Sequence, residues 1–133
     1  METTYELRLK VRDYECDIQG IVNNSVYQNY MEHTRHEYLK SLGHDFAQLA
    51  ELKIMPVVYR IETDYKLPLR SGDEFVSKLT MEKQGALKLL FHQSVYRLSD
   101  MKLSVKSIVT AVVLNNGRPT SPDLILENLY RVS

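Results

Sequence analysis

The chain has 133 residues, of which 44% are hydrophobic and 26% charged, and its formal net charge at pH 7 is zero. That length is typical of a single domain that buries roughly 65–70% of the surface of its unfolded chain and folds without a structural metal or disulfide. The sequence has one cysteine and no secretory signal pattern, which predicts a cytoplasmic protein. It has no apolar run of membrane-spanning length, so no membrane span is expected. It has no basic block, so nucleic acid is not expected as the main partner.

The N-terminal part predicts a strand followed by the longest helix. Apolar and polar residues alternate over residues 4–12, which is the period of a strand with one buried face. After a polar loop, apolar residues recur every three or four positions over residues 26–42, as in a helix of about five turns packed on one side. Ser25 and Gln28 have the spacing of a capping box, and Gly43 is typical of a helix end.

The remainder of the chain predicts four strands and a short C-terminal helix. The strands are separated by turn signals and cover residues 57–66, 75–81, 87–98 and 101–114. Strands joined by short turns pair antiparallel. Ser121 and Pro122 are expected as N-cap and first residue of a helix over residues 123–130.

This order of elements predicts one α+β domain spanning residues 1–133. A curled, five-stranded antiparallel sheet would wrap around the single long helix, which buries one sheet face. The other face also carries apolar residues, such as Val112 and Leu114. Because one helix cannot cover both faces, we expect contacts between copies of the chain.

The loop before the long helix holds the residues with the clearest chemical potential. A positive φ at Gly20 would let the loop bring backbone N–H groups to the helix N-terminus, where partial positive charge gathers. A carboxylate such as Asp17, placed beside such donors, is the minimal equipment for acyl transfer to water. The alternative interpretation is that Asp17, Asn23 and Asn24 only form turns and caps, for which these residue types are generally preferred.

Several motifs resemble those of the 4-hydroxybenzoyl-CoA and acyl-CoA thioesterase family, which has the hotdog fold. They are Val11-Arg12-x-Tyr14-x-x-Asp17-x-x-Gly20-x-Val22-x-Asn24-x-x-Tyr27, Glu32-x-x-Arg35-x-x-x-Leu39, Tyr65-x-x-Pro68-Leu69-x-x-Gly72-Asp73 and Gly117-x-Pro119. Strand order and helix position agree with the resemblance, which covers most of the chain.

The resemblance implies hydrolysis of an acyl-CoA, aromatic or fatty, at a site between subunits of a homodimer or homotetramer. Asp17 would attack the thioester carbonyl or activate a water, and the backbone N–H of Asn24 would polarise the carbonyl oxygen. Substrate contacts are expected from Gly20, Asn23, Tyr27 and Tyr59. Tyr59 is included because its aromatic side chain could line an acyl or aryl pocket. No cofactor is expected, since CoA is part of the substrate.

The loop lacks two histidines that subgroups of this family carry, at the positions of Ile21 and Asn24. A histidine base at either place is excluded, and with it the main requirement of a hydroxyacyl dehydratase, the other enzyme class considered on this fold. A non-catalytic module that binds acyl thioesters stays open as an alternative. No metal site is expected, because His33 and His36 lie off the apolar stripe without a third ligand.

Overall fold

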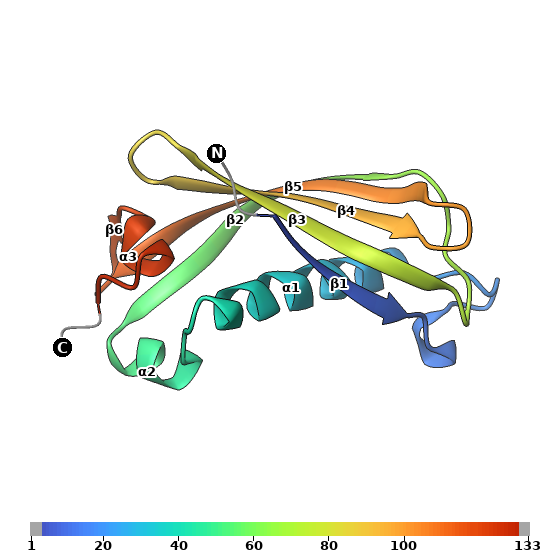
Figure 1. The fold of residues 1–133 in the computed structure, drawn as a ribbon, viewed down its shortest axis with the longest axis horizontal. Coiled ribbons are helices and arrows are strands. Elements are labelled where there is room, and N and C mark those ends of the chain that lie inside the picture. Colours follow the sequence, from blue (N-terminus) through green and yellow to red (C-terminus); the bar gives the residue numbers. More distant parts are fainter. Residues whose placement is uncertain (1–3, 131–133) are drawn as a thin grey trace.

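The computed structural model describes residues 4–130 and consists of one antiparallel sheet with a long helix on one face (Figure 1). The strands are β1 (Thr4–Lys10), β2 (Ile54–Tyr65), β3 (Glu74–Gln84), β4 (Lys88–Arg97), β5 (Lys102–Asn115) and β6 (Arg118–Thr120). The helices are the 3-10 turn η1 (Asp13–Glu15), α1 (Asn24–Ser41), α2 (Phe46–Glu51) and α3 (Asp123–Leu126). None of the helices in this range is long and apolar enough to cross a bilayer.

The sheet has the strand order β1-β3-β4-β5-β2, with β6 paired to β5, and all pairs are antiparallel. The predicted fold class, a curled sheet wrapped around one long helix, is therefore confirmed. Three short elements, η1, α2 and β6, were not predicted. They contain three to six residues, which is too few for apolar periodicity to reveal them.

The N-cap of α1 is Asn23, so the predicted capping box of Ser25 and Gln28 is wrong. Asn23 Oδ1 accepts hydrogen bonds from the backbone N–H and the hydroxyl of Ser25, at 3.0 and 2.9 Å. The Gln28 side chain reaches β2 instead of turning back to the cap. Asn is as good a cap as Ser and precedes it by two residues, so the helix begins at Asn24. Gly43, at φ +92°, ends the helix as predicted.

The C-terminal helix is shorter than predicted. Its N-cap is Pro122, although the Ser121 hydroxyl does accept a hydrogen bond from the Asp123 N–H, at 3.2 Å. The helix stops because Asn128 takes the left-handed conformation, at φ +53°. There the Asn128 side chain donates a hydrogen bond to the Leu42 carbonyl oxygen at 2.9 Å, which holds the C-terminal segment against the end of α1.

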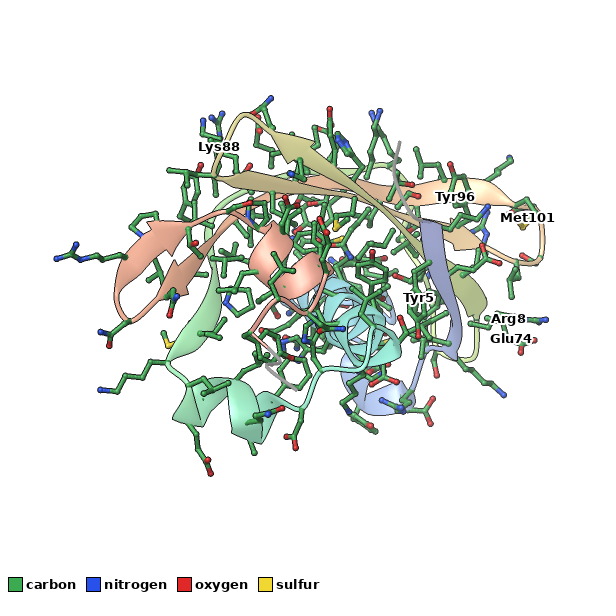
Figure 2. All side chains as sticks on the ribbon, turned by 60° about the vertical axis from the view of Figure 1, so that its left-hand side comes forward. Tyr5, Arg8, Glu74, Lys88, Tyr96 and Met101 are labelled. Carbon is green, nitrogen blue, oxygen red and sulfur yellow. The ribbon has the colours of Figure 1, made fainter. Side chains whose placement is uncertain are left out.

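The core lies between α1 and the concave face of the sheet, where side chains fill the space seen in Figure 2. Lys88 and Met101 mark opposite ends of the sheet in that view and are both exposed. The buried face of α1 consists of Tyr27, Tyr30, Met31, Thr34, Arg35, Tyr38 and Leu39. Within it, the hydroxyls of Thr34 and Ser77 are hydrogen-bonded at 2.7 Å, which satisfies both buried groups.

β2 lies at one edge of the sheet and is the most exposed of the long strands. The register against β5 shifts between Val58 and Arg60, which is a β-bulge centred on Tyr59. The strict alternation predicted for residues 57–66 is therefore interrupted, since a bulge inserts one residue and shifts the faces of those beyond it. Val58 and Ile61 consequently both point toward the helix side, whereas Tyr59 is 52% exposed.

Candidate active site

The loop between η1 and α1 forms a tight hairpin that carries Asp17. Cys16 and Val22 form an isolated antiparallel bridge, and the Asp17 N–H donates to the Ile21 carbonyl oxygen at 2.9 Å. Gly20 closes the turn at φ +80° and donates its N–H to the Asp17 carbonyl oxygen at 2.9 Å. A residue with a Cβ is disfavoured in that conformation. The hairpin therefore holds Asp17 directly before the helix N-terminus.

The Asp17 carboxylate organises this turn and is exposed in the single chain. Its Oδ1 accepts hydrogen bonds from the backbone N–H groups of Gln19, at 2.8 Å, and Ile21, at 3.4 Å. Within residues 4–130 these two groups are its hydrogen-bond donors, and no cation forms an ion pair with it. Its second oxygen, Oδ2, has no hydrogen-bond partner among the described residues, so it is free to act on a reactant.

The first turn of α1 presents a backbone N–H without an acceptor. The Asn23 side chain takes the N–H of Ser25, and the Asn23 carbonyl oxygen takes that of Val26 at 2.9 Å. In the described part of the chain the N–H of Asn24 makes no hydrogen bond. The first N–H groups of a helix lack intrahelical partners and carry partial positive charge. The Asn24 amide is thus suited to an oxyanion.

A cavity of about 220 Å³ adjoins the start of α1. It is lined by Ile21, Val22, Asn24, Tyr27, Tyr65, Lys66, Leu67 and Pro68. The buried Tyr27 hydroxyl accepts the Leu69 N–H at 2.8 Å, and its ring centroid lies 5.7 Å from that of Tyr65. Burial raises the pKa of Tyr27 above its ordinary value, so the phenol stays neutral. Tyr27 therefore forms a fixed wall of this cavity.

The other predicted substrate contacts lie outside the small cavity. Gly20 and Asn23 are exposed on the hairpin and at the helix cap, and the Asn23 oxygen is occupied by capping. Tyr59, on the bulge of β2, lines neither this cavity nor the larger one described next. Asp17 also lies outside both linings. Substrate contact by these residues stays a prediction.

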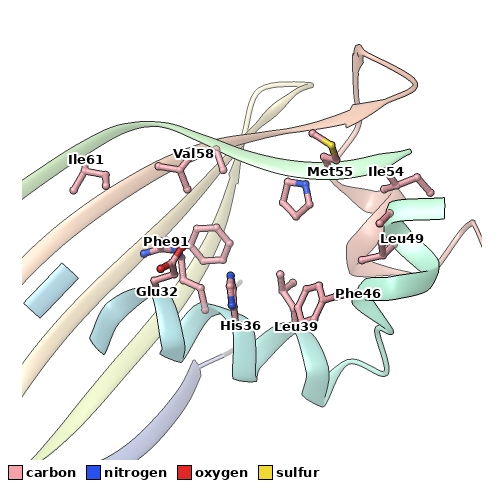
Figure 3. Close-up of a pocket in the computed structure, with 14 residues that line it drawn as sticks. Glu32, His36, Leu39, Phe46, Leu49, Ile54, Met55, Val58, Ile61 and Phe91 are labelled. Carbon is pink, nitrogen blue, oxygen red and sulfur yellow. The ribbon is translucent and has the colours of Figure 1, made fainter. Parts of the chain in front are cut away.

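A larger cavity, of about 570 Å³, lies between the C-terminal half of α1, α2 and β2 (Figure 3). Its apolar wall includes Leu39, Phe46, Leu49, Ile54, Val58 and Ile61. Glu32, Arg35 and His36 form its polar side on α1. Both the volume and the mainly apolar lining are typical of sites that bind small molecules. Nothing in the sequence pattern indicated this cavity, because α2 was not predicted.

Arg35 is a buried cation in the wall of the larger cavity. Its side chain is 9% exposed, and Nη1 donates a hydrogen bond to Gln93 Oε1 at 2.9 Å. Gln93 is held in turn by its own donation to the Met31 carbonyl oxygen at 3.0 Å. Burial lowers the pKa of the Arg35 guanidinium, and the nearby Glu32 carboxylate opposes this effect. The Arg35–Gln93 pair thus fixes α1 to β4.

Gln28 connects α1 to β2 between the two cavities. Its Nε2 donates to Thr63 Oγ1 at 3.0 Å and to the Tyr65 hydroxyl at 3.2 Å. The sequence pattern placed Gln28 in a capping box and gave no indication that it would contact Thr63 or that Arg35 would border a cavity. The available signal was the four-residue spacing of Asn24, Gln28 and Glu32, which places them on one side of a helix.

Three further side chains of a reactive type are Cys16, His33 and His36. Burial, followed by the charges of Asp13 and Asp17, raises the pKa of the Cys16 thiol, which disfavours the nucleophilic thiolate. His36 lies beside Phe46 at the larger cavity, with ring centroids 5.4 Å apart, and His33 is exposed. Among residues 4–130, no three His, Cys, Asp or Glu side chains come close enough together to hold a metal ion.

Comparison with known sequences relates this chain to thioesterases. The family model of the thioesterase superfamily matches residues 19–104, a range that includes Asn24 and Tyr27 and begins two residues after Asp17. A chloroplastic acyl-acyl carrier protein thioesterase of Arabidopsis thaliana is 36% identical over 116 residues, which cover 87% of this chain and 61% of the relative. The chain thus spans about three fifths of that relative's length.

Solved structures share the fold of this chain. A hypothetical protein of Aquifex aeolicus superposes with a TM-score of 0.83 at 29% identity, covering 92% of this chain and 97% of the other. A 1,4-dihydroxy-2-naphthoyl-CoA thioesterase of Synechocystis superposes with a TM-score of 0.85 over 98% of this chain and 100% of its own. At 12% identity, that second likeness shows the fold alone.

Proposed function

Because this chain belongs to the thioesterase superfamily, we propose that it hydrolyses an acyl-CoA thioester to a free acid and CoA. The proposal rests on the geometry at the point where the Asp17 hairpin meets the N-terminus of α1. There the Asn24 N–H, without an acceptor in the described chain, borders a cavity, and the exposed Asp17 carboxylate stands on the hairpin just before it. An oxyanion donor and a carboxylate are the groups that acyl transfer to water requires.

Two routes fit these groups, and both give the same products. In the first, an Asp17 oxygen attacks the carbonyl carbon, the C–S bond breaks, and water then hydrolyses the mixed anhydride. In the second, Asp17 takes a proton from water, the hydroxide attacks, and the departing thiolate is protonated. In either route, the Asn24 N–H would stabilise the negative oxygen of the tetrahedral intermediate.

A homodimer formed through β2 belongs to this proposal, because Asp17 is open to solvent in the single chain. Apolar side chains are exposed along this edge strand: Met55, Val58, Tyr59, Ile61 and Tyr65. An exposed apolar edge strand favours pairing with another chain. A second copy on this edge would cover the groove between α1 and β2 and enclose the substrate.

Tyr59→Lys is expected to weaken the dimer, since lysine on an edge strand opposes pairing. We expect the dissociation constant to rise at least ~10-fold, which corresponds to about 1.4 kcal/mol. Light scattering coupled to size-exclusion chromatography over a concentration series measures the change. Tyr14→Lys is the matched control, because Tyr14 is 78% exposed and belongs to η1 rather than to the edge strand β2. An unchanged dimer in the Tyr59 variant would place the interface elsewhere.

A thiol-trapping assay tests the activity itself. We expect the purified chain to release free thiol from at least one member of an acyl-CoA panel with aromatic acyl groups and straight chains of different length. The same acyl groups on acyl carrier protein belong in the panel, because the Arabidopsis relative is named for that carrier. Saturable binding without thiol release would instead favour the alternative, a non-catalytic module that binds acyl thioesters.

A cytoplasmic location remains a prediction that rests on cysteine usage. The Arabidopsis relative is chloroplastic, so relationship by itself does not assign a compartment to this chain.

A further inference from the structure

The two cavities lie along one side of α1. Asn24 lines the small cavity and Glu32 lines the large one. Gln28 stands midway between them, four residues from each. Residues spaced by four lie on the same side of a helix, one turn apart. The two cavities are therefore successive sections of one groove along α1, separated at the level of Gln28.

The opposite wall of the groove is formed by β2, whose residues border the small cavity and the large cavity in the same order along the groove as those of α1. Tyr65 lines the small cavity and Ile61 lines the large one. Thr63 lies between them, and alternate residues of a strand point to the same face. At this level the Gln28 amide reaches across the groove and donates to Thr63 Oγ1 at 3.0 Å. The groove is thus closed between its two sections by a side-chain bridge.

The β2 end of this bridge is anchored more firmly than the α1 end. Thr63 Oγ1 also lies 2.8 Å from the Ser107 hydroxyl on β5, which fixes it to the sheet. In contrast, the Gln28 Oε1 atom is buried and has no hydrogen-bond partner. A buried carbonyl oxygen without a donor is unfavourable. A substitution of Gln28 therefore removes the bridge, yet leaves the hydrogen bond between Thr63 and Ser107 in place.

We propose that the Gln28–Thr63 bridge sets the upper length of the acyl chain and that the larger cavity is the extension of the acyl site behind it. This inference rests on the proposed function. The rise from Asn24 to Gln28 is about 6 Å, so a thioester at the Asn24 amide leaves room for roughly four to six carbons before the bridge. Longer chains reach the apolar cavity only when the bridge is open.

Gln28→Ala tests the proposal with straight-chain acyl-CoA substrates of 4 to 14 carbons. The alanine variant is expected to raise kcat/KM for chains of 10 to 14 carbons at least ~10-fold, while kcat/KM for the four-carbon substrate changes less than ~3-fold, because a bridge between the sections affects only chains that pass it. Gln28→Glu keeps the size but has no N–H to donate, and the Thr63 and Tyr65 hydroxyls already donate to Ser107 and to the Asn24 carbonyl oxygen, so this variant should also open the bridge and raise kcat/KM for the long chains. Asn29→Ala removes an exposed amide from the adjacent helix position and should leave the length profile unchanged.

A binding measurement separates this inference from the proposed reaction. S-butyl-CoA and S-dodecyl-CoA are thioethers that cannot be hydrolysed, and calorimetry gives their affinities for each variant. The proposal expects Gln28→Ala to tighten dodecyl-CoA binding selectively, even if no thioester is hydrolysed. It is overturned if the alanine variant changes both chain lengths equally, or if the wild-type protein already binds or hydrolyses 12-carbon chains as well as 4-carbon chains.

Discussion

Asp17→Asn is expected to lower kcat for thioester hydrolysis by at least ~10²-fold, the scale on which a positioned general base contributes. The fold should persist, because the asparagine oxygen can still accept the N–H groups of Gln19 and Ile21 that organise the turn. What the variant loses is the basic and nucleophilic carboxylate on the hairpin that precedes α1. Steady-state thiol release at saturating substrate measures the effect, and the melting temperature verifies the fold.

The matched control is Asp13→Asn, on the same loop. Asp13 accepts a hydrogen bond from the Ser71 hydroxyl, which an asparagine oxygen can also accept, so we expect a change in kcat of less than ~3-fold. Wild-type rates in the Asp17 variant would remove Asp17 from the mechanism. Single turnover in ¹⁸O-labelled water identifies the nucleophilic route when label appears in the Asp17 carboxylate, because this requires water to attack the Asp17 carbonyl of a mixed anhydride.

Gln93→Leu is expected to destabilise the folded chain by about 3 kcal/mol, because it removes the acceptor of a buried guanidinium. Arg35 is 9% exposed. Among the described residues, Gln93 is the group that accepts a hydrogen bond from the Arg35 guanidinium. The variant also loses the donation from Gln93 to the Met31 carbonyl oxygen. Urea unfolding followed by circular dichroism measures the change in the free energy of unfolding.

The double variant Arg35→Met, Gln93→Leu provides the control for this prediction. Replacing both partners by apolar groups of similar shape removes the unpaired charge, so the double variant should recover at least ~1.5 kcal/mol relative to Gln93→Leu alone. If the two substitutions lower the free energy of unfolding additively, the destabilisation comes from lost packing, and the Arg35–Gln93 hydrogen bond contributes little to stability.

Much of the fold follows from local pattern. The alternation over residues 4–12 and the three- and four-residue spacing of apolar residues after position 26 correspond to β1 and α1. Gly43 ends the helix in a left-handed conformation that glycine adopts without strain. These signals involve residues within one or two turns of each other, so the sequence alone contains them.

The candidate site was predictable only in part. Asp17, Asn24 and Tyr27 lie within eleven residues of each other, and the motif that contains them predicted the helix N-terminus and the family, whereas the hairpin was seen only in the structure. The exact cap was not predicted, since Asn23 and Ser25 are equally suitable residue types and the choice depends on how the hairpin enters the helix.

By itself, therefore, the sequence determined the α+β class, the long helix, the family and the acid that precedes the helix. The tertiary structure alone decided the bulge at Tyr59, both cavities and the contacts that border them. Gln28 and Thr63 are 35 residues apart, and Arg35 and Gln93 are 58 apart. Such pairs meet only after α1 has packed against the sheet, and periodicity, which compares near neighbours, carries no information about that packing.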